Sequence, residues 1–114
     1  MPRSVAAVAA AFALGAALLA TRALAADPVE FALTIEKHVF SPAEIRVKAG
    51  APFVLVISNN DDTAEEFESK QLRVEKVVPA KKTVRLRLPG LKAGTYPFVG
   101  EFHEATAKGK IIAE

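Results

Sequence analysis

Short segments in which apolar and polar residues alternate fill most of the chain beyond residue 28, and they constrain the fold more than any other feature. The run TVRLRL places Val84, Leu86 and Leu88 on one face, and EFALTIE places its three large apolar residues in the same way. A period of two residues is that of a β-strand with one buried face. No segment here keeps a helical period for three turns, so the sequence predicts an all-β fold.

Turn residues divide this part of the chain into about seven strands, which suggests an antiparallel β-sandwich of one domain. PFVLVI is apolar on both faces and is predicted to be a central strand. The acidic segment 61–71 is predicted to be a loop, with a turn of helix at Asp62 or Thr63 as an option, followed by a strand from about Leu72. The remaining predicted strands are EFALTIE, AEIRVKAG, KKTVRLRLPG, GTYPFVG and KGKIIAE.

The first 25 residues have the pattern of a secretory signal peptide. A basic start at 1–4 precedes an apolar run at 5–20, and Ala23-Leu24-Ala25 is a small-x-small cleavage pattern. The alternative is a membrane anchor, but the run is rich in alanine and short for a bilayer span. The expectation is therefore a signal peptide at 1–25, a periplasmic protein and one domain at 26–114.

The charge of the expected mature chain excludes nucleic acid as a partner. The whole chain has 15 basic and 13 acidic residues, and removing Arg3 and Arg22 leaves 13 of each. No excess positive charge then remains to neutralise phosphates. The basic run with Arg85 and Arg87 is predicted to be the solvated face of one strand, with a partner or anion surface as the alternative. No nucleophile motif or phosphate-binding loop is present, so no enzyme activity is expected.

Three separated segments carry a resemblance to a known family. FSPAEIRVKAG, VISNNDD and GTYPFVGEFHEATAKG, in this order and spacing, resemble the cupredoxins. The resemblance implies a Greek-key β-sandwich with a mononuclear copper at one pole. EFESKQLRVEKVV and YPFVGEFHE are similar to a narrower Cys-less group, related to the cupredoxin domain of EfeO-type proteins. That likeness implies bacterial periplasmic uptake of iron or copper beside a membrane permease.

The copper ligands of the blue-copper members do not carry over as a set. His103 matches the histidine of the last loop, but Gly100 stands at the cysteine position and Lys108 near the axial methionine. The position of the first histidine falls near Glu65. A type 1 copper site needs a thiolate, and the chain has no cysteine.

Carboxylates gather where the resemblance would place copper ligands. Glu66 and Glu68 flank Phe67, and Glu101 and His103 flank Phe102, so each pair shares one face of an extended backbone. If the two loops meet at one pole, these donors converge on an ion that prefers hard to borderline ligands, such as iron or Cu(II). Solvated loop acids are the alternative. The predicted metal ligands are Glu66, Glu68, Glu101 and His103, with Glu65 left open as a replacement for Glu66.

The second histidine, His38, has two interpretations, as a further ligand or as an exposed turn residue, and its place at a strand end favours the turn. Three functions stay open. The first is a periplasmic metal-binding protein that passes iron, or copper, to a membrane permease or periplasmic partner. The second is a copper-binding electron carrier, and the third is a metal-free interaction module.

Overall fold

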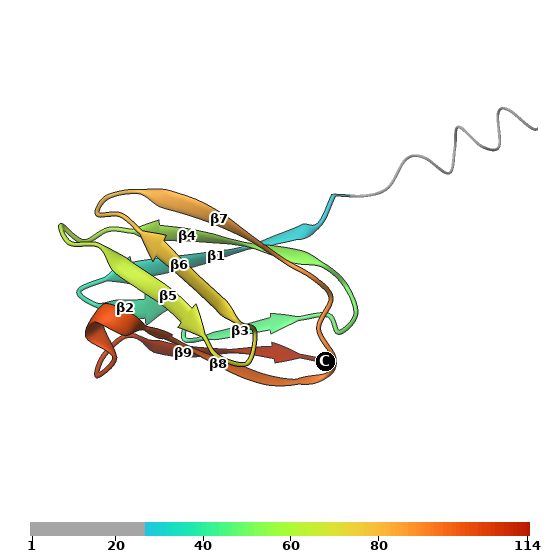
Figure 1. Ribbon diagram of the computed structural model, residues 1–114. Coiled ribbons are helices and arrows are strands. Elements are labelled where there is room, and N and C mark those ends of the chain that lie inside the picture. The colour runs from blue at the N-terminus through green and yellow to red at the C-terminus, as the bar shows by residue number, and fades with distance from the viewer. Residues whose placement is uncertain (1–26) are drawn as a thin grey trace, which may run out of the picture.

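The computed structural model describes residues 27–114, which form a sandwich of two β-sheets (Figure 1). The all-β prediction is confirmed, since the only helix in this range is a single 3-10 turn. The signal peptide predicted at 1–25 lies outside the described residues. Within 27–114, no helix is long and apolar enough to cross a membrane.

The first sheet has four strands, in the order β2-β1-β4-β7. Strand β4 is central, as its apolar sequence predicted, and Phe53, Val54 and Leu55 are all buried. It pairs in parallel with β1 and antiparallel with β7. The strand bounds are β1 Val29–Glu36, β2 Val39–Ser41, β4 Phe53–Asn59 and β7 Thr83–Leu88.

The second sheet has five strands, in the order β3-β9-β8-β5-β6. Strands β3 and β9 are parallel, whereas the other neighbours are antiparallel. Both sheets are therefore mixed, and the prediction of a purely antiparallel sandwich is wrong. The chain crosses repeatedly between the two sheets. As a result, β1 and β4 run in the same direction side by side, and so do β3 and β9. The bounds are β3 Glu44–Val47, β5 Glu65–Ser69, β6 Val74–Val78, β8 Gly94–Gly100 and β9 Lys108–Ala113.

The sandwich has nine strands rather than the predicted seven. Strand β2 is three residues long, too short to show an alternation. Strand β5 lies in the segment that was predicted to be a loop. Its glutamates have a low intrinsic preference for strands. Pairing with β6 and β8 overrides that local preference, and Phe67 anchors β5 in the core.

Three phenylalanine rings form the part of the core that lies below one end of the sandwich. Phe40, Phe67 and Phe98 come from β2, β5 and β8, and their ring centroids are 4.9–6.1 Å apart. Each is at most 2% exposed. Above them, the β1–β2 turn, the β4–β5 loop and the loop after β8 meet at one end of the sandwich (Figure 1).

Candidate metal site at one end of the sandwich

The loop after β8 holds His103 in a compact turn. The 3-10 helix η1 spans Glu101–His103, and the loop is closed by the Gly100 amide, which donates to the Ala107 carbonyl at 2.9 Å. The His103 carbonyl accepts the Ala107 amide, also at 2.9 Å. The expectation of an extended backbone here is wrong. Phe102 is 51% exposed and is not a core anchor, since a 3-10 turn rotates successive side chains apart.

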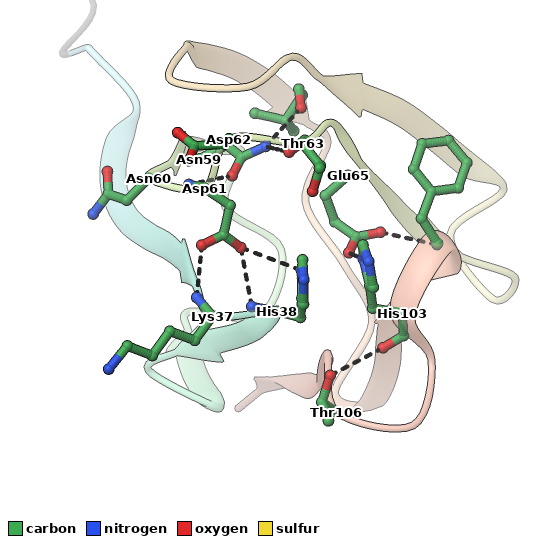
Figure 2. Close-up of polar contacts among 12 residues, drawn as sticks. Lys37, His38, Asn59, Asn60, Asp61, Asp62, Thr63, Glu65, His103 and Thr106 are labelled. Carbon is green, nitrogen blue, oxygen red and sulfur yellow. Dashed lines mark hydrogen bonds and ion pairs between the residues drawn. The ribbon is translucent and has the colours of Figure 1, made fainter.

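Glu65 lies at the start of β5 and points inward to His103, as Figure 2 shows. Its side chain is buried, with 1% of the residue exposed. Oε2 accepts from His103 Nδ1 at 2.6 Å, and Oε1 accepts from the amides of Phe102 at 2.9 Å and Glu66 at 3.0 Å. An ionised carboxylate can only accept, so a neutral His103 that donates to it carries its hydrogen on Nδ1 and leaves the Nε2 lone pair free. A carboxylate behind a histidine in this way is typical of metal-binding imidazoles.

The Glu65 carboxylate also fills the space beside Gly100. A Cβ at position 100 would come within 2.6 Å of Glu65 Cδ and 2.7 Å of Ala107 Cβ. The cysteine position of the blue-copper pattern is therefore closed to a side chain. Neither the donor set nor the space around Gly100 fits a type 1 copper centre.

His38 completes the arrangement from the β1–β2 turn. Its ring stacks on that of His103, with centroids 3.5 Å apart and planes 12° from parallel. Its Nδ1 lies 3.4 Å from Asp61 Oδ2. The side chains of His38 and His103 are 41% and 30% exposed, so a solvated ion can reach both. His38 is a turn residue, as the sequence favoured, but its ring belongs to the site.

The turn that carries His38 is strained. Lys37 and His38 have φ angles of 52° and 59°, and a non-glycine residue in this region costs roughly 1–2 kcal/mol. Asp61 accepts both turn amides, and these hydrogen bonds, that of His38 first, lower the pKa of the Asp61 carboxyl. The turn therefore depends on a contact from the β4–β5 loop.

A polar trio of one carboxylate and two imidazoles results. His38, Glu65 and His103 each offer a donor atom, and these atoms lie within 4.8 Å of one another. Two imidazoles with a carboxylate and no sulfur suit Cu(II), Fe(II) and similar ions better than Cu(I).

The other predicted ligands lie in a separate group, which we call the acidic cluster. Strand β5 alternates, so Glu66 and Glu68 point away from the core while Glu65 points toward it. Glu68 pairs across the strands with Glu75 of β6. The predicted set is thus divided, with His103 beside Glu65 and the three other carboxylates together. The acidic cluster consists of Glu66, Glu68, Glu75 and Glu101, whose donor atoms lie within 4.8 Å of one another.

Mutual contact raises two pKa values in the acidic cluster. The pKa of Glu68 is raised by its hydrogen bond with Glu101, then by burial and by the charge of Glu101. The pKa of Glu101 is raised chiefly by its hydrogen bond with Glu66. An acid whose pKa is higher in the folded state stabilises the fold below its unfolded pKa, and that contribution is lost as the pH rises through the folded pKa.

We therefore expect Glu101→Gln to raise the thermal unfolding midpoint at pH 7 and to change it little at pH 4, where the raised pKa of Glu101 favours its protonated form. Calorimetry of the metal-free protein at the two pH values measures both effects. Glu36→Gln, an exposed glutamate on β1, is the control. Equal gains at pH 4 and pH 7 would contradict the account of the cluster.

Two residues of these groups were not found from the sequence. Asp61 entered the sequence analysis only as the first residue of the acidic segment predicted to be a loop, and it contacts the β1–β2 turn from 23 residues away in the chain. Glu75 was not singled out, because its place opposite Glu68 depends on the register of the β5–β6 hairpin.

Comparison with known proteins agrees with this architecture. A family model described as a cupredoxin-like domain matches residues 5–113. The uncharacterized protein RP394 of Rickettsia prowazekii is 42% identical over 84 residues, which are 74% of this chain and 67% of that protein.

Solved structures show the same fold at low sequence identity. Auracyanin A, a blue copper protein of Chloroflexus aurantiacus, is 15% identical with a TM-score of 0.66, covering 77% of this chain and 100% of that one. The metal-binding domain of the Streptococcus pneumoniae Cu(I)-exporting ATPase CopA is 14% identical with a TM-score of 0.66, over 80% and 91%. Amicyanin of Paracoccus versutus is 20% identical with a TM-score of 0.59, over 80% and 85%.

Proposed function

The chain belongs to the family of cupredoxin-like domains, and on that premise we propose that it is a periplasmic metal-binding protein. It takes up an iron or copper ion at the imidazoles of His38 and His103, with Glu65 holding the His103 ring, and delivers the ion to a membrane permease or a periplasmic partner. The proposal assigns it no catalytic role. Export rests on the signal-peptide pattern of residues 1–25.

The observation that carries the proposal is the buried Glu65–His103 pair. The Glu65 carboxylate is 1% exposed and accepts from three hydrogen-bond donors. Burying a carboxylate costs free energy, which indicates that this one at the end of the sandwich has a functional role. It fixes the ring orientation of His103 and leaves Nε2 as the ligand atom. The adjacent His38 offers a second imidazole, and the two nearly parallel rings must turn apart before both can direct a ring nitrogen at one ion.

The donor set favours carriage of an ion over electron transfer. Fast blue-copper chemistry depends on a copper–thiolate bond, and the chain has no cysteine. Nitrogen and oxygen donors bind Cu(II) most strongly among the divalent first-row ions, and imidazole also suits iron. The partial exposure of both imidazoles supports loading and release from one side of the site.

We expect calorimetric titration of the purified protein with Cu(II), Fe(II) and Fe(III) to show about one strong site. His103→Ala should weaken binding at least about 100-fold, since loss of a ligand costs more than loss of its supporting contact. Bound metal should also raise the thermal unfolding midpoint. Glu68→Gln is the matched control from the acidic cluster.

The opposite result would relocate the ion. If Glu68→Gln removed the strong site and His103→Ala left it intact, the acidic cluster would be the binding site. Equal affinities for wild type and both variants would contradict a metal-binding function, and the interaction-module hypothesis would then be favoured.

A further inference from the structure

The β1–β2 turn is built from residues that do not favour its conformation. Two-residue hairpin turns with positive φ at both positions strongly prefer Asn-Gly or Gly-Gly. Here the two positions are Lys37 and His38, with φ angles of 52° and 59°. A strained backbone that persists must be held by its surroundings, and such strain concentrates at functional sites.

The group that holds this turn is the carboxylate of Asp61. Oδ1 accepts the Lys37 amide at 2.7 Å, and Oδ2 accepts the His38 amide at 3.0 Å (Figure 2). Oδ2 also lies 3.4 Å from the Nδ1 atom of the His38 ring. One side chain therefore contacts both the backbone of the turn and the imidazole that the turn carries.

Asp61 is itself held in place by a buried neighbour. The Asp61 amide donates to Asn59 Oδ1 at 3.0 Å, and Asn59 is 1% exposed. The Asn59 side-chain amide donates to the carbonyls of Thr63 and Val78, at 2.9 and 3.0 Å. The Asp61 carbonyl accepts the Lys81 amide at 3.2 Å. Asn59, at the end of β4, therefore holds the loop from which Asp61 contacts the turn.

We propose that Asp61 is a positioning residue for the metal site, which holds the strained Lys37–His38 turn so that the His38 ring lies against His103. This inference rests on the proposed function, because it makes Asp61 the residue that brings the second imidazole to the ion. A residue that only stabilised the hairpin would lower the unfolding midpoint and leave the site unchanged.

The test compares Asp61→Ala with Asp61→Asn, which keeps one carbonyl acceptor, and with Asp62→Ala as the matched control. The Asp62 side chain is 92% exposed and contacts Lys81 at 3.4 Å, outside the turn. In the metal-free protein, NMR of the imidazole protons reports the stack, since each ring shields the protons of the other. With Cu(II) as the probe, calorimetry gives the affinity and electron paramagnetic resonance counts the bound nitrogens.

We expect Asp61→Ala to shift the ring protons of both histidines downfield, to weaken Cu(II) binding about 10- to 100-fold, and to reduce the bound nitrogens from two to one. Asp61→Asn should be intermediate, and Asp62→Ala should match wild type. Lys37→Gly, which adopts a positive φ without strain, should restore part of the stack and of the affinity to Asp61→Ala. In a His38→Ala background, Asp61→Ala should have no further effect on affinity.

If Asp61→Ala leaves the chemical shifts of the imidazole protons unchanged and only lowers the unfolding midpoint, the proposal is overturned. An equal loss of affinity from Asp61→Ala with and without His38 would also overturn it. Failure of the proposed function looks different. Wild type would then not bind Cu(II), while the NMR comparison in metal-free protein would still decide whether Asp61 positions His38.

Discussion

A Glu65→Gln protein is expected to keep its fold and to bind Cu(II) about 10- to 100-fold more weakly than wild type, the usual effect of removing the contact behind a ligating histidine. Glutamine has nearly the same shape, and its carbonyl oxygen can still accept the amides of Glu66 and Phe102. Its NH₂ group then faces His103 Nδ1. That nitrogen must become an acceptor, so the ring hydrogen moves to Nε2 and the ligand lone pair is lost.

The tautomer of His103 separates this mechanism from a general loss of structure. Long-range proton–nitrogen NMR should show hydrogen on Nδ1 in wild type and on Nε2 in Glu65→Gln. The free energy of unfolding should fall by about 1–2 kcal/mol, because charge-assisted hydrogen bonds become neutral ones. Glu66→Gln, the next residue on the opposite face of β5, should leave the tautomer unchanged. Normal affinity in Glu65→Gln together with an unchanged tautomer would contradict the assigned role of Glu65.

Gly100→Ala is expected to destabilise the protein by about 1–3 kcal/mol or more, as overpacking of a closed space does. The new methyl group would lie 2.6 Å from Glu65 Cδ and 2.7 Å from Ala107 Cβ. In a Glu65→Ala background the same substitution should cost less, since one of the two collisions is removed. Urea unfolding of the four proteins gives the coupling energy, expected at about 0.5–3 kcal/mol.

The same crowding predicts the outcome of attempts to build a blue-copper centre. Gly100→Cys alone should give no intense blue Cu(II) form, because the Glu65 carboxylate occupies the space that the new side chain needs. Combining it with Glu65→His supplies the two histidines and one thiolate that such a site needs. Combining it with Glu66→His should fail, since that side chain points to the acidic cluster. A blue form in the Glu66→His combination alone would show that the inward and outward residues of β5 are assigned wrongly by one position. In the urea experiment, losses of unfolding free energy in Gly100→Ala and Glu65→Ala that simply add in the double variant would show that the two side chains do not collide.

The period of two residues was sufficient to predict most of the strands. Val84, Leu86 and Leu88 point to the core side of β7, with Arg85 and Arg87 exposed, as expected. Strand β5 could not be recognised in this way, because its inward residues include Glu65, a charged group whose burial depends on His103 and on the amide of Phe102. Those partners lie nearly 40 residues away in the chain.

The sequence identified His103 and Glu65 as counterparts of metal ligands, and the structure brings these two together. The sequence prediction was wrong for the backbone at Glu101, because residues 101–103 were expected to be extended and form a 3-10 turn, although Glu101 does lie with Glu66 and Glu68. It also undervalued His38. A stack between a turn and a loop 65 residues apart depends on how the hairpin bends, and no local pattern encodes that bend.

The directions of β1 and β9, the first and last strands, determine how this domain can be attached to another molecule. Strand β1 runs toward the end that carries His38, and β9 runs away from the loop that carries His103 (Figure 1). Residues 27 and 114 are therefore both at the far end of the sandwich. A linker, a fusion partner or an immobilising surface joined at either point would leave the histidines facing outward, free to meet an ion or a second protein.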